Sequence, residues 1–318
     1  MAIDLLSILR NEWLDNIELI SGKQPHDIRN YLTTGEYAPL DPFLPKSIAL
    51  YYSDLSVVNR SYASEVNRFS AASFESIQGI GPDNKLTKSL SWSLIRLYYA
   101  AFFAAHALIR LHGRSLTQVD TASCVRVNNL AKAYSTLNSE PLTNGLQRIS
   151  IKRTPNLIEL AKVGEKPHEA LWLNFGEVFK PVAQRVLKSA TTTEIQEFAV
   201  KLMDLLRILS DEGRMPNYNW LSFMRNSINY RQSHSVWHPY GTQPKYCSSL
   251  HDIVNQWTDN PNDLNFWPSQ DRELQHMVES CVFIVSLCKQ CCEDINRAAP
   301  DRKSFLKYKA LNLLQHIT

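Results

Sequence analysis

The pattern of apolar and polar positions predicts helices along most of the chain. Apolar residues recur three or four apart over residues 3–19, before Gly22. The strongest repeat covers residues 86–112, "LTKSLSWSLIRLYYAAFFAAHALIRLH", which is apolar on nearly every face and is followed by Gly113. A helix with that pattern is buried on most of its sides. We therefore expect an amphipathic helix at residues 3–19 and a core helix at residues 86–112.

Two more helices are predicted in the C-terminal half. One begins within "TTTEIQEF", where Thr193 and Gln196 form a capping box. The other is the last long helix, which begins at Ser269 after a loop rich in Pro, Asp and Asn. A single apolar stripe should turn this last helix toward the core. The stripe consists of Leu274, Met277, Val278, Cys281, Val285, Cys288, Cys292 and Ile295.

A further helical candidate covers residues 220–241, "WLSFMRNSINYRQSHSVWHPYG". Asn217 or Asn219 is suited to cap its N-terminus. Pro239 should end the helix near Trp237, because the residue before a proline disfavours helical geometry. The segment contains neither Lys nor Glu, the residues that usually build a solvated helix face.

The remaining segments have weaker patterns. The proline-rich stretch "GEYAPLDPFLPKS" reads as a connector, "GLQRISIKRT" as a short strand and "HEALWLNFGEVFKPVAQRVL" as a broken helix. We therefore predict an all-α protein. Its parts are an N-terminal helical region with a connector at residues 1–80, and a helical bundle at residues 81–318 with an insertion around residues 114–190.

Composition fits a soluble globular protein. Hydrophobic residues make up 44% of the 318 residues and charged residues 20%, and the low count of 10 Gly disfavours a turn-rich β-sandwich. The net charge of +3 permits an acidic partner such as RNA but does not require one. The chain has no run of five basic residues. Any surface for nucleic acid must therefore combine dispersed positions such as Arg110, Arg114, Arg225 and Arg231.

Neither an export signal nor a membrane span is expected. The N-terminal segment carries charges where a signal peptide has an apolar run. Residues 92–111 are apolar but are interrupted by Arg96, His106 and Arg110, which makes them a poor membrane span. These features predict a cytoplasmic protein without membrane contact, in which the six cysteines stay reduced.

The motifs of common enzymes and metal sites are missing from the sequence. "CKQCC" contains one CxxC step, whereas a structural zinc site usually draws four ligands from two pairs. Cys281, Cys288 and Cys292 also fall on the apolar stripe of the last helix, where a cysteine acts as a small hydrophobe. The chain has no GxxxxGK[ST], GxGxxG, GxSxG or HExxH. We therefore expect neither a bound metal nor a cofactor.

The candidate chemistry lies in residues 220–241. On a continuous helix, Asn226, Tyr230 and His234 stack at four-residue steps, and Arg225 lies on the flank of that face. A second set, which shares His234, has a spacing of three and then four residues. That set is Arg231, His234 and His238.

Arginine, amide, tyrosine and histidine side chains in one cleft suit RNA cleavage without a metal ion. A histidine with a near-neutral pKa can take the proton of a ribose 2′-hydroxyl or give one to the 5′-oxygen leaving group. A guanidinium stabilises the charge that develops on the phosphate in the transition state.

Two stretches resemble HEPN domains, which are small helical bundles of prokaryotic defence and toxin systems. "LYYAAFFAAHALIRLHG" is similar to their first long helix, and Arg225-Asn226 resembles the start of their Arg-polar-spacer-His motif. The resemblance covers residues 86–112 and 193–297. It implies a HEPN-like bundle, RNA as partner, a homodimer in which the motif helices meet, and a protein partner from the same defence system.

The sequence departs from the family pattern at the histidine. In the motif, four to six residues separate the Arg from the His. After Arg225 that window holds Tyr230, Arg231 and Gln232. His234 follows two residues too late. Arg231 and His238 have the expected spacing, but such a spacing arises readily by chance in a chain with 9 His.

Three interpretations of residues 220–241 remain open. Arg225 and Asn226, together with Tyr230 or His234, form a working variant of the ribonuclease site. Alternatively, the site has decayed and the helix binds RNA or a protein partner. In the third interpretation the aromatic residues pack in the core and the polar ones are solvated. The preferred hypothesis is a metal-independent endoribonuclease of an antiphage defence or toxin system, and the alternative is a non-catalytic binding module.

His106 has two interpretations of its own. It lies in an otherwise apolar helix, between Ala105 and Ala107. A histidine in that position is more often a hydrogen-bonded core residue than a catalyst. If the helix at residues 86–112 faces the helix that carries Arg225, His106 could instead contribute to the cleft.

Overall fold

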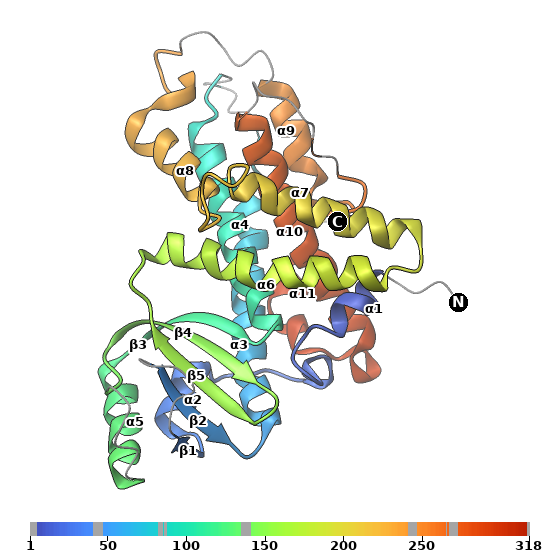
Figure 1. The fold of residues 1–318 in the computed structure, drawn as a ribbon. Helices are drawn as coiled ribbons and strands as arrows, with labels where there is room; N and C mark the ends of the chain where they lie inside the picture. Colours follow the sequence, from blue (N-terminus) through green and yellow to red (C-terminus); the bar gives the residue numbers. More distant parts are fainter. Residues whose placement is uncertain are drawn as a thin grey trace.

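The computed structural model describes residues 5–40, 47–81, 85, 88–134, 141–240, 247–264, 266 and 273–316. Helices account for 63% of the chain, and a five-stranded antiparallel sheet accounts for 12%. Figure 1 shows the sheet at one end of the molecule and α8 and α9 at the other. The protein is therefore mixed α/β, and the predicted all-α class is wrong.

The described residues form the following elements. The strands are β1 (Tyr37–Leu40), β2 (Ser47–Tyr52), β3 (Arg114–Val119), β4 (Gly145–Lys152) and β5 (Leu157–Lys162). The α-helices are α1 (Leu5–Arg10), α2 (Ile28–Thr34), α3 (Leu55–Ile77), α4 (Ser91–Leu111), α5 (Thr121–Ala133), α6 (Pro167–Ser189), α7 (Thr193–Leu209), α8 (Trp220–Arg231), α9 (Cys247–Asn255), α10 (Glu273–Ala298) and α11 (Ala310–Gln315). The short 3-10 helices are η1 (Ile17–Leu19), η2 (Ser233–Ser235), η3 (Gln256–Thr258), η4 (Pro300–Arg302) and η5 (Phe305–Tyr308).

The sheet joins strands that are far apart in the sequence. Its order is β1-β2-β5-β4-β3, and every neighbouring pair is antiparallel. At its centre Ile48 of β2 pairs with Leu160 of β5. Only β4 is predicted as a strand, within "GLQRISIKRT", and that prediction is confirmed. The other strands have only four to six residues, too few for a clear local pattern. The pairs β2–β5 and β3–β4 also join strands that are distant in the sequence.

One face of the sheet packs on α3. Ile48, Leu50 and Ile149 are buried on this face. Ser115 of β3 points the same way, and its Oγ lies 3.4 Å from the hydroxyl of Tyr62 on α3. Through this packing the strands of residues 1–80 and of the predicted insertion form one layer over a shared helix.

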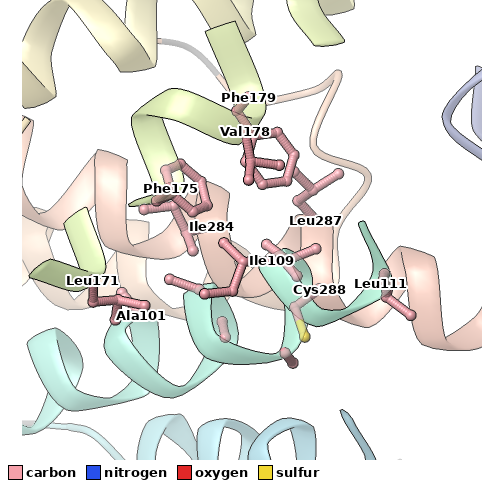
Figure 2. Close-up of a cluster of buried hydrophobic side chains, with 14 of the residues drawn as sticks. Ala101, Ile109, Leu111, Leu171, Phe175, Val178, Phe179, Ile284, Leu287 and Cys288 are labelled. Atoms are coloured by element: carbon pink, nitrogen blue, oxygen red, sulfur yellow. The ribbon is translucent and has the colours of Figure 1, made fainter. Parts of the chain in front are cut away.

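Helix α4 is the central helix of the bundle. It packs against α3, α6, α8 and α10. Figure 2 shows Ala101 and Ile109 of α4 among side chains of α6 and α10. Gly113 follows the helix with a φ of 71°, and a Cβ there would lie 2.9 Å from a Leu14 methyl carbon. By length and hydropathy α4 is the described helix that could cross a membrane, yet 78% of its apolar window is buried inside the protein.

The predicted helix over residues 3–19 is wrong as a continuous element. Its described part breaks after Arg10 and resumes as the short η1. Leu14 lies in the break, and its N–H donates to the carbonyl of Leu111 at the end of α4 over 2.7 Å. The apolar spacing therefore reflects a turn that packs on α4, since Trp13, Leu14 and Ile17 are all buried.

Helices α6 and α7 also differ in detail from prediction. The residue that caps α7 is Thr192, whose side chain accepts a hydrogen bond from the Ile195 N–H, so the Thr193–Gln196 capping box is wrong. Helix α6 continues through Pro181, although a broken helix was predicted. Its buried face, which includes Phe175 and Phe179, packs on both sides of the proline and holds the helix together.

The last long helix agrees with prediction in its buried face. All eight residues of the predicted stripe on α10 are buried. Several predicted boundaries lie outside the described residues. These are the start of the first helix at Ile3, the start of the core helix at Leu86, part of the connector at residues 41–46, the end of the segment at Gly241 and the start at Ser269.

Helix α8 is shorter than the predicted helix at residues 220–241. Asn219 occupies the N-cap position, but its side chain makes no capping hydrogen bond. The helix ends at Arg231, because Gln232 adopts left-handed geometry with φ 50°. His234 is also left-handed, with φ 67°. Trp237 then folds back, and its indole N–H donates to the Ile228 carbonyl over 2.8 Å. His234 therefore does not share a helical face with Asn226 and Tyr230, as was predicted.

Candidate functional site

Arg225 lies where α8 crosses α4. Trp220, Leu221, Met224 and Ile228 bury one side of α8 in the core. Arg225 is half-buried on the edge of α8, and α8 packs against α4.

Two side chains fix the Arg225 guanidinium. Its Nη1 donates to the Asn226 carbonyl oxygen over 2.7 Å, and its Nη2 donates to the Tyr99 hydroxyl over 2.5 Å. The third nitrogen, Nε, is enclosed and has no described partner. A guanidinium carries five N–H donors, so each terminal nitrogen keeps one donor for a ligand.

Aromatic rings surround the same guanidinium. Its central carbon lies 5.8 Å from the Tyr98 ring centroid, 5.4 Å from that of Tyr99 and 5.7 Å from that of Tyr230. Ring faces at these distances attract a cation. Desolvation lowers the pKa of Arg225, but the Tyr99 hydroxyl and neighbouring phenols raise it more, so the side chain stays charged.

The charge of Arg225 has no carboxylate to balance it among the described residues. Its described partners are an amide and phenols. The sequences of α4 and α8 contain arginine but no Asp, Glu or Lys. A half-buried cation in such surroundings attracts an anion from solution.

His168 belongs to the same cluster and is the site residue that the sequence did not reveal. It lies in the first turn of α6, and its Nδ1 is 2.8 Å from the Tyr98 hydroxyl. Its ring centroid lies 5.9 Å from that of Tyr99 and 4.5 Å from that of Phe102. Desolvation, followed by the charge of Arg225, lowers the pKa of His168 to about 4. The imidazole is therefore neutral at pH 7.

The hydroxyl of Tyr98 holds this arrangement together. It accepts a hydrogen bond from the Trp172 indole N–H over 3.2 Å and lies 2.8 Å from Nδ1 of His168. Burial raises the pKa of Tyr98, so the phenol keeps its proton. One hydroxyl thus links α4 and α6 beside Arg225.

The sequence-predicted residues divide into two groups. Arg225, Asn226 and Tyr230 lie together, with Tyr230 71% exposed at the rim. The others have different neighbours. Nδ1 of His234 is 3.7 Å from a Glu273 carboxylate oxygen, the guanidinium of Arg231 lies 5.8 Å from the Phe223 ring, and the His238 ring lies 5.7 Å from the Tyr240 ring.

His106 is a buried, hydrogen-bonded residue of α4. The Nη1 of Arg110 lies 3.0 Å from its Nδ1, and its ring stacks on Phe69 at 4.7 Å. Desolvation, helped by the charge of Arg110, lowers its pKa well below the ordinary value. The Phe102 ring contacts both histidines: its centroid lies 4.8 Å from that of His106 and 4.5 Å from that of His168.

Metal ligands do not gather at this site. In the part of the chain that the structure describes, no group of three or more His, Cys, Asp and Glu side chains could hold a metal ion. Cys281, Cys288, Cys291 and Cys292 are buried in the core, where desolvation raises the pKa of the Cys281 thiol. Those cysteines act as packing residues.

A separate pocket of about 900 Å³ lies in the N-terminal region, between the segment after η1 and the start of α3. Lys23, His26 and Arg60 line it together with Glu36 and Asp54, so its charges are mixed. None of the sequence-predicted site residues reaches it.

Comparison with known proteins yields no relative. No family model matches the chain, and neither a curated protein nor a solved structure is significantly similar to it.

Proposed function

We propose that this protein is a metal-independent endoribonuclease in which Arg225 binds the scissile phosphate. The observation that carries the proposal is the state of Arg225. It is charged, half-buried and without a described carboxylate partner, and it keeps one free donor on each terminal nitrogen. Phosphate oxygens are acceptors that suit two such donors.

Asn226 and Tyr99 would act by orienting the guanidinium. Both hold it through hydrogen bonds before a ligand arrives. An oriented donor stabilises the charge on a transition state without first having to reorganise. Tyr230, exposed beside Arg225, would contact the neighbouring nucleotide rather than replace the missing histidine of the HEPN motif.

The resemblance to HEPN domains supports the biological part of the proposal. It suggests a role in antiphage defence or as a toxin, and a homodimer that brings two Arg225 sites together. Sedimentation of the pure protein tests the dimer.

The test of the activity compares two arginines of the same helix. Wild-type protein, Arg225→Ala and Arg231→Ala are incubated with total RNA and tRNA in EDTA, and the products are resolved on a denaturing gel. Arg225→Ala should lose about a hundredfold to a thousandfold in rate, as for loss of a transition-state donor. Arg231→Ala should stay close to wild type, because Arg231 packs on Phe223 instead.

Arg225→Lys separates the positive charge of Arg225 from its planar set of hydrogen-bond donors. A lysine keeps the positive charge but cannot donate to Asn226, Tyr99 and phosphate in one plane. We expect it to bind RNA and to cleave slowly. Intact RNA with wild-type protein, or full cleavage by Arg225→Ala, would contradict the proposal.

A non-catalytic module that binds RNA or a protein partner is the second candidate. The end of α8 at Arg231 favours it, because His234 and His238 leave the helix that carries Arg225. Binding without cleavage should weaken steeply with salt and leave the RNA intact. Cleavage should follow the ionisation of a proton-transfer group.

A further inference from the structure

Two side chains of the Arg225 cluster share the same pair of tyrosines. Arg225 donates to the hydroxyl of Tyr99, and its central carbon lies 5.8 Å from the Tyr98 ring centroid. His168 bonds to the hydroxyl of Tyr98, and its ring lies 5.9 Å from that of Tyr99. A phosphate held by Arg225 would thus lie along the same aromatic wall as a half-buried imidazole.

The hydrogen bonds of Tyr98 leave one nitrogen of His168 unused. Nδ1 faces the Tyr98 hydroxyl, and Nε2 lies on the other side of the ring. A hydroxyl accepts two hydrogen bonds and donates one. Trp172 can only donate to Tyr98. The Tyr98 hydroxyl therefore keeps one acceptor position for Nδ1 of His168, and an Nδ1 that donates there leaves Nε2 without a proton.

We propose that His168 is the proton acceptor of the cleavage reaction, with its proton on Nδ1 and its free Nε2 facing the ribose 2′-hydroxyl. The assignment rests on the proposed ribonuclease function. Tyr98 is then a positioning residue, because it fixes the tautomer and the plane of the ring.

The step balances without a co-reactant other than water. Nε2 of His168 takes the 2′-hydroxyl proton, and the 2′-oxygen forms a bond to phosphorus. The bond between phosphorus and the 5′-oxygen breaks, and the leaving oxygen takes a proton from water. The products are a 2′,3′-cyclic phosphate and a 5′-hydroxyl, and the hydroxide left behind is neutralised by the proton on His168.

The charged and titratable groups around His168 agree with this role. Tyr98, Tyr99 and His106 face it from α4, and Arg225 faces it from α8. Burial and the Arg225 charge hold its pKa at about 4. A proton acceptor works in its neutral form, so this one is ready at every pH above about 4. The cost is a weaker base than an ordinary imidazole.

The experiment measures cleavage of a labelled RNA oligonucleotide in EDTA by wild-type protein, His168→Gln, His234→Gln and His26→Gln. His234 is the competing proton carrier, and His26 is an exposed histidine of the N-terminal pocket. We expect His168→Gln to lose about a hundredfold or more in kcat. The other two variants should keep wild-type activity, because His234 faces Glu273 and His26 lies in the N-terminal pocket.

The pH profile separates His168 from an ordinary histidine. The acid limb of wild-type kcat/KM should lie near pH 4, whereas a solvated histidine would place it near 6.5. A 2′-deoxy nucleotide at the cleavage point should block the reaction in every variant. If His168→Gln cleaves RNA at the wild-type rate, the role of His168 is overturned and the proposed function still stands. RNA left intact by wild-type protein would overturn both.

Nuclear magnetic resonance reads the tautomer without any substrate. Long-range ¹H–¹⁵N spectra of protein labelled in histidine should show a protonated Nδ1 and a bare Nε2 for His168. In Tyr98→Phe this preference should be lost, and kcat should fall more than KM changes. A proton found on Nε2 in the wild-type protein would overturn the assignment, whatever the folding of the variants.

Discussion

Two arginines of the helical bundle have opposite electrostatic surroundings. Arg110 is 1% exposed, and its Nε donates to the Glu65 carboxylate over 2.5 Å. Arg225 is half-exposed, and its described partners are an amide and phenols. Both contact aromatic rings, and each has a histidine nearby. The difference is the carboxylate: Arg110 is paired with Glu65 inside the fold, whereas Arg225 has no carboxylate partner among the described residues.

The largest expected effect is the loss of folding stability when Arg110 is replaced. Arg110→Met leaves the buried Glu65 carboxylate, which is 2% exposed, with the more distant Arg68 at 3.8 Å, and should lower the free energy of unfolding by about 3–5 kcal/mol. Arg225→Ala should lower it by only about 1 kcal/mol, because its partners can turn to water. Urea unfolding measures both.

A double variant is the control for that prediction. Glu65→Gln with Arg110→Met removes the stranded charge and should recover much of the loss. Equal destabilisation by Arg110→Met and Arg225→Ala would erase the distinction between the two arginines.

The second effect is the pH dependence of stability. Desolvation lowers the pKa of His106 well below 6.5 and that of His112 to about 4. Between about pH 6.5 and 4 the unfolded chain therefore binds more protons than the folded one, and stability falls as the pH falls. Thermal unfolding at pH 7, 6 and 5 should show a decreasing Tm.

His106→Asn tests how much His106 contributes to the fall of Tm with pH. The variant should be less stable at pH 7, since it loses ring packing on Phe69, but its Tm should fall less steeply on acidification. His168 is half-exposed beside Arg225 and should titrate near pH 4 without unfolding the protein. A wild-type Tm that stays constant from pH 7 to 5 would contradict both desolvated histidines.

A smaller effect concerns the support of the Arg225 helix. Trp237→Phe removes the indole hydrogen bond to Ile228 and should cost about 1 kcal/mol. Trp92, whose ring packs edge-on against Trp237 at 5.5 Å, is 67% exposed. Trp92→Phe is therefore the matched control and should cost less. Chemical denaturation of both variants decides the order.

The smallest effect concerns His234. Its carboxylate partner Glu273 is 3.7 Å away and 58% exposed. Exposed pairs of this kind contribute about 0–1 kcal/mol, so Glu273→Gln should change Tm hardly at all. It should also leave RNA cleavage unchanged. A large loss of activity in Glu273→Gln would return His234 to the site in place of His168.

Parts of the fold could be predicted because their signal is local. The core helix at α4, the buried stripe of α10 and the strand β4 follow from apolar spacing within one element. The sheet could not, because Ile48 pairs with Leu160 across more than a hundred residues. Short strands carry little pattern of their own.

The candidate site shows the same division. Arg225 and Asn226 are adjacent in the sequence, and their hydrogen bond on α8 needs no distant partner. His168 comes from α6, and only packing through Tyr98 brings it to Arg225. Its sequence signal is a single histidine in the first turn of an aromatic-rich helix, which alone points to nothing.

The sequence by itself determined the helical content of the bundle and the cluster of arginine and amide side chains on α8, since both depend on neighbours within a few turns. Tertiary structure decided where α8 ends and which histidine meets Arg225. Trp237 turns back onto Ile228 and draws His234 away, while Tyr98 holds His168 in place. The physical reason is that hydrogen bonds and burial between distant elements outweigh the weak preference of a few polar residues to continue a helix.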